Sequence, residues 1–155
     1  MAKSIAQQIV EAIIARVEEI RLRNGYSTDA GRSVFWSRQA PDSGDLPCSV
    51  VWAEAPVMVE RYIGGRRARY TRLVTVEAMA EGEAETSGVL ADQLLADLQT
   101  AILGPVDETI GGLVAALHLE SADVGPRDDG GLIAGASLGV RVEYFAGFGN
   151  PYGLE

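Results

Sequence analysis

Residues that form covalent cross-links, metal centres and catalytic sites are scarce in this sequence. Cys48 is the only cysteine, so the chain cannot form an internal disulfide or gather several thiolates around a metal, and a reducing compartment is expected. His118 is the only histidine, so any histidine-based site would depend on one imidazole. No eighteen apolar residues run together, and we expect neither a signal peptide nor a membrane span.

The phosphate-binding glycine motifs are also missing, although the chain has 18 glycines. There is no G-x-x-x-x-G-K-[ST] sequence, and no G-x-G-x-x-G joins a strand to a helix. Asp128-Asp129-Gly130 lacks the further oxygen ligands of a calcium loop and indicates a turn. The sequence therefore predicts no cofactor and no metal site.

Basic charge is limited as well. The 13 basic residues stand against 22 acidic ones, for a net charge of -9 and a pI near 4.6. Nucleic-acid binding depends on Lys and Arg neutralising phosphates, so this balance argues against a general nucleic-acid binder. At 155 residues and 47% apolar composition, the chain is expected to form a single globular domain, residues 1–155.

The spacing of apolar residues predicts two helices. Ser4 and Gln7 are typical of a capping box, and isoleucine and valine then recur at helical spacing to about residue 23. A second helix begins at Thr86 or Ser87 and ends at Gly104-Pro105, where glycine and proline prevent continuation.

Short apolar or alternating runs predict the strands, which are residues 34–36, 48–53, 57–63, 67–80, 113–120 and 138–145. Residues 41–47 form a turn-rich loop and residues 125–131 another, and the tail, residues 146–155, is expected to be extended. Hairpin-scale turns join the strands, so the fold class is α+β, with a mainly antiparallel sheet, two amphipathic helices on one face, a projecting β-hairpin and the order α-β-β-β-β-α-β-β. The other face of the sheet is either wet or covered by another subunit.

The most informative feature present is the hairpin over residues 57–76, with Gly64-Gly65 at its turn. It carries five arginines and one acid, Glu60, for a local charge of +4, which leaves -13 on the other 135 residues. Such segregated charge suits copies of the chain that meet basic face to acidic face. The residues that we expect at this interface are Arg61, Tyr62, Arg66, Arg67, Arg69, Tyr70 and Arg72.

Other interpretations of the hairpin remain open at this point. Charged side chains also protect exposed strand edges from unwanted pairing. The same arginines could bind phosphates, with Tyr70 as a stacking platform beside Arg66, Arg67 and Arg69 in a single-strand nucleic-acid binder. A different class, a small hydrolase or metal enzyme, would use Glu81, Glu83 and His118. His118 and the glutamates are, however, also typical of a solvent-facing strand and an acidic helix start.

Several segments resemble one family of phage proteins. They are N-G-Y-S-T-D-A-G at residues 24–31, V-F-W at 34–36, P-C-S-V-V at 47–51, V-R-V-E-Y at 140–144 and G-N-P at 149–151. In this order, and over nearly the whole chain, they resemble the tail terminator family of long-tailed bacteriophages, also called the minor tail protein U-like or tail-completion family.

The resemblance implies a structural role without enzymatic activity. It implies a homohexameric ring at the head-proximal end of the virion tail, made in the host bacterial cytoplasm, that stops tube polymerisation. Its partners would be the tail tube protein and the head-tail connector protein, with DNA passing through the ring without specific binding and no membrane involved. It gives residues 57–76 a general role in ring and tube contacts. A head-completion or connector-adaptor protein of the phage neck is the alternative.

Overall fold

The computed structural model describes residues 1–37, 42–83, 85–126 and 133–154 of the chain. Its helices are α1 (Ile5–Glu18) and α2 (Ser87–Leu103), and its strands are β1 (Val34–Trp36), β2 (Cys48–Ala53), β3 (Val57–Arg61), β4 (Arg67–Glu81), β5 (Ala116–Pro126) and β6 (Ile133–Gly147). Short 3-10 turns occupy Leu22–Asn24 and Ser43–Asp45. The predicted α+β class and the order α-β-β-β-β-α-β-β are confirmed.

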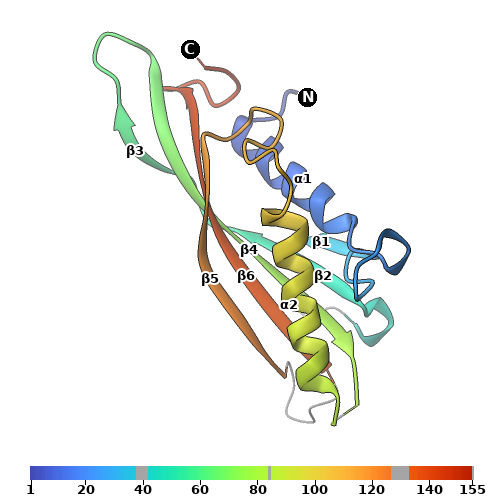
Figure 1. Cartoon of the computed structure of the whole chain (residues 1–155). Coiled ribbons are helices and arrows are strands. Elements are labelled where there is room, and N and C mark those ends of the chain that lie inside the picture. Colours follow the sequence, from blue (N-terminus) through green and yellow to red (C-terminus); the bar gives the residue numbers. More distant parts are fainter. Residues whose placement is uncertain (38–41, 84, 127–132, 155) are drawn as a thin grey trace.

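The strands form a six-stranded sheet in which the order is β1-β2-β4-β6-β5, and β3 pairs with β4 outside this path. All pairs are antiparallel except β1 with β2, which are parallel. Figure 1 shows both helices packed against the same side of this sheet. The sheet is therefore mainly antiparallel, as predicted, with one parallel pair at its edge.

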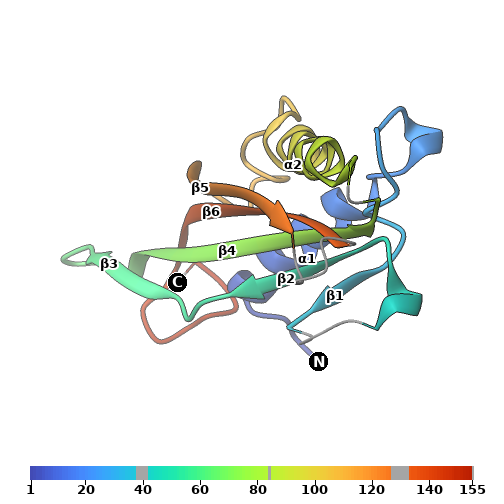
Figure 2. The same cartoon turned by 90° about the horizontal axis from the view of Figure 1, so that it is seen from below.

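Strand β4 is the central strand of the sheet because it is long enough to pair with three other strands. It pairs with β6 along its full length on one edge. On the other edge, its second half pairs with β2 and its first half, between Ala68 and Thr71, pairs with β3. The hairpin of β3 and β4 consequently extends past β2 and the helices, as Figures 1 and 2 show.

Period-2 alternation along the sheet puts the main core on the helix side. Val74, Val76 and Ala78 of β4 are fully buried there, together with Leu138 and Val140 of β6. The apolar stripes of both helices cover them; the fully buried helix residues include Ile9, Ile13, Val17, Leu94, Leu98 and Ile102. Full burial of one such side chain contributes roughly 1.5–3 kcal/mol, so this layer supplies most of the stability.

We call the opposite side of the sheet, which carries no helix, the open face. At the β1–β2 end it holds a small second cluster built around Cys48, Val50 and Met79, with Phe35 and Trp52 packed against them. Cys48 is fully buried in this cluster, and a buried thiol in apolar surroundings is inert.

The first helix is shorter than predicted. It ends at Glu18, about one turn before residue 23, because the following loop packs against its last carbonyls. A Cβ on Gly31 would lie 2.2 Å from the Val17 oxygen, so only glycine allows this approach. Gly25, with φ of 90°, takes the left-handed conformation that ends the 3-10 turn after the helix.

Strand β5 begins and ends later than the predicted strand over residues 113–120. Ile110, Gly111 and Gly112 all have positive φ angles, and the turn they form continues to Val114. The strand starts only at Ala116 and runs into the predicted 125–131 loop as far as Pro126; residues 127–131 lie outside the described part of the chain.

The C-terminal tail is not extended, in contrast to the prediction. After β6 the chain turns back, with a bridge between Gly147 and Asn150. The Pro151 carbonyl accepts a hydrogen bond from the Ile5 amide at 2.8 Å, and the Gly153 carbonyl accepts one from Gly147 at 2.7 Å. The tail therefore docks beside the start of α1 because it satisfies backbone groups there. Neither helix in the described ranges has the length and apolar character needed to cross a membrane.

Candidate interaction surface

The arginine hairpin, residues 57–76, is exposed along β3 and at its turn. All five residues of β3 are exposed, because β3 pairs with β4 on one edge and has no described partner on the other. The turn is closed by a hydrogen bond from the Gly65 amide to the Tyr62 carbonyl, and Gly64 has the positive φ of 82° expected at this position. The predicted projecting hairpin is confirmed as a structural element.

The hairpin exposes apolar as well as basic side chains. Val57, Met58 and Val59 follow one another and are 59%, 45% and 48% exposed, and Ile63 at the tip is fully exposed. Three consecutive exposed apolar residues on a strand with a free edge are unusual, because such edges promote pairing with other chains. The hairpin surface is therefore apolar as well as charged.

Two of the hairpin arginines lie over aromatic rings. The Arg61 guanidinium is 3.9 Å from the centre of the Phe148 ring, and that of Arg67 is 4.2 Å from the centre of the Phe145 ring. Tyr62 packs at 6.2 Å from Phe145. Cation–π contacts of this kind orient a guanidinium without neutralising it, so both arginines remain positive on the surface.

Arg66, at the turn, is exposed, and its side chain makes no hydrogen bond or ion pair within the described residues. Arg69 differs. It lies on the open face between two carboxylates, 3.6 Å from Glu60 and 3.5 Å from Glu143. Glu143 in turn lies 4.0 Å from the His118 ring. The charge of Arg69 is therefore largely balanced inside the chain.

Tyr70 and Arg72 point to the helix side of the sheet and are partly buried. Tyr70 stacks on the buried Tyr144 with ring centres 5.6 Å apart. Arg72 donates hydrogen bonds to the carbonyls of Glu54 at 2.7 Å and of Ala6, in α1, at 3.2 Å. These contacts tie the base of the hairpin to the body.

Burial has opposite effects on the two titratable groups at this base. It lowers the pKa of the Arg72 guanidinium, with a smaller opposing effect from Tyr144. Burial raises the pKa of the Tyr144 phenol, and the nearby Arg72 charge partly offsets this. The sequence pattern thus grouped seven residues that the structure separates: Arg61, Tyr62, Arg66 and Arg67 are outward, while Arg69, Tyr70 and Arg72 are engaged within the chain.

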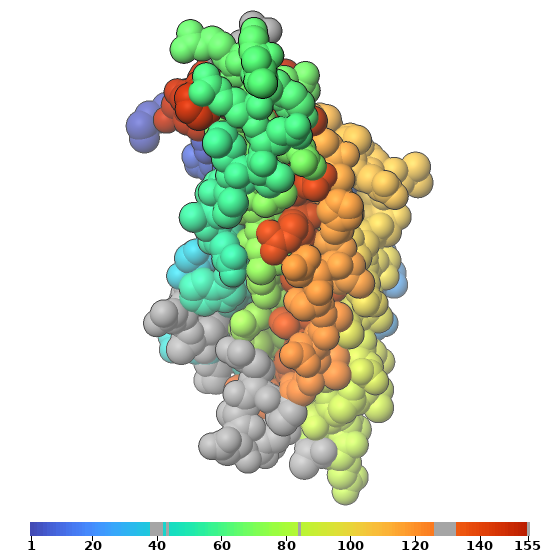
Figure 3. Space-filling view, turned by 90° about the vertical axis from the view of Figure 1, so that its left-hand side faces the viewer, coloured from blue at the N-terminus to red at the C-terminus, as the bar shows by residue number. Residues whose placement is uncertain are grey.

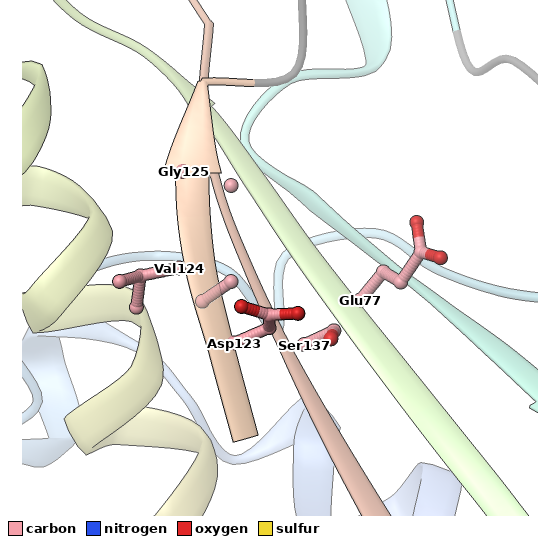
Figure 4. Close-up of a pocket in the computed structure, with 7 residues that line it drawn as sticks. Glu77, Asp123, Val124, Gly125 and Ser137 are labelled. Atoms are coloured by element: carbon pink, nitrogen blue, oxygen red, sulfur yellow. The ribbon is translucent and has the colours of Figure 1, made fainter. Parts of the chain in front are cut away.

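The open face between β3 and β5 is a strip of β4 and β6 side chains, visible in Figure 3. Its upper part is basic through the arginine hairpin. Its lower part contains a hollow of about 260 Å³ lined by Glu77, Asp123 and Ser137, with the glycines of β5 and β6 beside them (Figure 4). Among the described residues, the basic hairpin and the acidic side chains of Glu77 and Asp123 thus lie at opposite ends of one face.

The groups proposed for a hydrolase are not brought together. His118 is level with Leu73 of β4 through their shared partner Arg141, whereas Glu81 is eight residues further along β4. At roughly 3.3 Å per residue this separates them by about 26 Å. Across the described ranges, no three His, Cys, Asp or Glu side chains are grouped as metal ligands.

Sequence reasoning missed two features that the structure makes prominent. One is the free edge of β5, where Leu119 and Val124 are 52% and 45% exposed. The other is the buried Asp97 of α2, which accepts hydrogen bonds from the Thr28 hydroxyl at 2.7 Å and the Ser27 amide at 3.2 Å. The run Val57-Met58-Val59 signals exposed apolar surface on β3 and not on β5. Nothing in the sequence pairs Asp97 with residues 70 positions away.

Of three comparisons with known proteins, only the search of solved structures found matches. No family model matches the sequence, and no curated protein does. Among solved structures, the chain is similar to one from the virion of a native gene transfer agent (GTA) particle, with 11% sequence identity, a TM-score of 0.41 and coverage of 92% of each chain.

Proposed function

We propose that this protein is a structural virion component that forms a ring at the head-proximal end of a phage tail tube. In this role it ends tube polymerisation and provides the docking surface for the head connector. The role in the virion follows from the resemblance of residues 24–31 and the segments after them to tail terminators. The proposed partners are further copies of the chain in a hexamer, the tube protein and the connector protein.

One observation carries the contact part of this proposal, namely that the arginine hairpin projects from the body with apolar and basic side chains exposed together. Interfaces are built from apolar and aromatic anchors with arginine among them. A ring requires heterologous contacts, in which one patch meets a different patch of the next copy. A basic hairpin on a chain of net charge -9 fits that requirement, because a twofold contact would place like charges together.

The seven hairpin residues take two roles in this proposal. Arg61, Tyr62, Arg66 and Arg67 contact the neighbouring subunit or the tube. Arg69, Tyr70 and Arg72 hold the hairpin in place through Glu60 and Glu143, Tyr144 and the α1 backbone. Shape and charge complementarity perform the function, and no chemical step is part of it.

The test is the size of the purified protein, alone and with tail tubes. We expect ring-shaped particles with a central hole in electron micrographs, a native mass of several chains, and binding of these particles to one end of tubes. The protein should also restore tail length in a terminator-deficient phage. A chain that stays monomeric and neither caps tubes nor restores tail length would overturn the proposal. Copurification with portal-bearing heads in place of tails would assign it to another neck position.

A further inference from the structure

Three strands of the sheet have an edge with no partner in the described residues: β1 and β3 on one side and β5 on the other. β1 has only three residues, so β3 and β5 offer the longer free edges. An unpaired edge presents a row of backbone N–H and C=O groups that can accept a further strand. β3 has five residues and β5 has eleven, so β5 can accommodate the full length of β3.

The two edges are complementary in charge. Residues 57–69, which contain β3 and the hairpin turn, carry four arginines and Glu60, for a charge of +3. Residues 116–126, which form β5, carry Glu120 and Asp123 and no Lys or Arg, for a charge of -2 with His118 neutral. Asp123 makes no ion pair in the described part of the chain, and Glu120 pairs only with Arg141.

The two edges also both expose apolar side chains. Val57, Met58 and Val59 lie on β3, and Leu119 and Val124 on β5. All five side chains are about half exposed in the single chain. Pairing of the edges would remove part of this surface from water, which favours association.

Strand direction supports the pairing of unlike edges in a ring. β3 is antiparallel to β4, β4 to β6 and β6 to β5, so β3 and β5 of one chain run in opposite directions. Rotation about an axis along the strands leaves strand directions unchanged. The β3 strand of a neighbour related in this way is therefore antiparallel to β5 of the first copy, so the alternation of strand directions continues across the contact.

The two strands do not lie at the same level of the sheet. β3 is level with Glu143 to Ala146 of β6, whereas β5 pairs with β6 from Glu143 down to Ala134. The neighbour must therefore be offset along the strands, and strands inclined to the ring axis produce such an offset.

We propose that the free edge of β3 pairs in antiparallel fashion with the free edge of β5 in a second copy of this chain. This pairing rests on the proposed function and would be the contact between neighbouring subunits of the proposed ring. The alternative pairings of β3 with β3, or of β5 with β5, would each bring like charges together.

Disulfide cross-linking tests this contact. Val59 and Ala122 are exposed, and the single native cysteine, Cys48, is fully buried and can stay in place. The variant with both Val59→Cys and Ala122→Cys should give a ladder of cross-linked oligomers under mild oxidation. Each single variant should stay uncross-linked. Cysteines at Met58 on β3, and at Leu119 or Val124 on β5, cover the neighbouring registers.

The matched control is Val59→Cys with Gln93→Cys, since Gln93 is exposed on α2 away from both edges. It should give no ladder. Dimers from Val59→Cys alone would instead show β3 pairing with β3, and rings that form without a cross-link at any of these positions would show another interface. Either result overturns the proposed pairing and leaves the proposed ring intact.

Hydrogen exchange gives a second readout, because side-chain docking would not protect backbone amides in this way. In the assembled protein, outward-facing amides of residues 116–126 should exchange at least about tenfold more slowly than in the monomer, the change expected from an added bond of about 1.4 kcal/mol. Unchanged exchange in intact rings would overturn the pairing. A chain that never assembles would overturn both proposals, whereas cross-linked rings that fail to cap tubes would overturn only the function.

Discussion

At the scale of the residue, Asp97 connects α2 to the loop of residues 24–31 through Ser27 and Thr28. Its buried carboxylate joins α2 to the Ser27 amide and the Thr28 hydroxyl, and Gly31 brings the same loop against the last carbonyls of α1. A buried acceptor of this kind stabilises the native state only while its donors are in place. The segment that resembles tail terminators is therefore also a structural clasp between the two helices.

Replacement of Asp97 by Ala should lower the free energy of unfolding by about 1–3 kcal/mol, because it leaves the Thr28 hydroxyl and the Ser27 amide without an acceptor. Urea denaturation of the unassembled chain measures this. Asp92, one turn earlier and exposed, is the matched control, and Asp92→Ala should change the free energy by less than about 0.5 kcal/mol. Equal effects of the two substitutions would contradict the clasp.

The raised pKa of Tyr144 leads us to expect that the stability of the chain falls at alkaline pH. Burial raises the pKa of this phenol above the usual 10.0, so the unfolded state loses its proton first as the pH rises. The contribution of the neutral phenol to stability is therefore fully present below about pH 10 and is lost between the unfolded and folded pKa values.

Between those values, the unfolding free energy should fall by up to about 1.4 kcal/mol per pH unit from this group. Tyr144→Phe removes the ionisable group, so its stability should decline less steeply above pH 10 than that of the wild type. Denaturation curves at several alkaline pH values provide the slopes. Tyr152→Phe, which alters an exposed tyrosine, serves as the control, and parallel slopes for wild type and Tyr144→Phe would refute this explanation.

At the scale of the element, the hairpin depends on contacts at its base more than on its turn. β3 has one partner strand and no helix over it. An isolated two-stranded hairpin is marginally stable in water, so the three-stranded continuation with β6 and the tie from Arg72 to α1 must position it. The hairpin therefore projects from the body while β6 and α1 hold its base.

Arg72→Met keeps most of the apolar stem and removes both hydrogen bonds to the Glu54 and Ala6 carbonyls. We expect it to lower the unfolding free energy by about 1.5 kcal/mol, the lower end of the range for bonds to charged groups, because the side chain is only partly buried. Amides of β3 should also exchange faster. Arg66→Met removes a guanidinium with no described partner and should leave both quantities unchanged; an equally stable Arg72→Met would remove its anchoring role.

At the scale of the whole molecule, the separation of charge has the largest consequence. A hairpin segment of charge +4 belongs to a chain whose other 135 residues carry -13. Among the described residues, the acidic side chains of Glu77 and Asp123 lie at the other end of the open face from the hairpin. Exposed charges of this kind act over about 10 Å at 0.1 M salt and about 3 Å at 1 M. Assembly that depends on them must therefore be salt-sensitive.

Reversal of Arg66 and Arg67 to Glu should leave the chain folded but weaken its self-association by tenfold or more, since close like charges replace close opposite ones. Sedimentation at increasing concentrations measures the association, and the wild type itself should weaken as salt rises. Arg23→Glu with Arg32→Glu makes the same charge change at exposed sites away from the hairpin and is the control. Unaffected association of the first variant would leave edge protection as the role of these arginines.

The element order, the fold class, the second helix and the hairpin turn could all be predicted from the sequence. Each follows from local rules: period-2 and period-3.6 apolar spacing, glycine where φ must be positive, and proline where a helix must stop. The sequence also located the basic charge. It could not show which arginines are free, because that depends on the sheet face to which each side chain belongs.

Long-range contacts determine that Arg72 and Tyr70 anchor the hairpin base, that Arg69 lies between Glu60 and Glu143, and that α1 ends at Glu18. The same contacts place unpaired edges on β3 and β5, in addition to the three-residue β1. These properties arise from contacts between residues far apart in the chain, and no local periodicity encodes them. Which strands lie at the edges of the sheet depends on how all the strands pair.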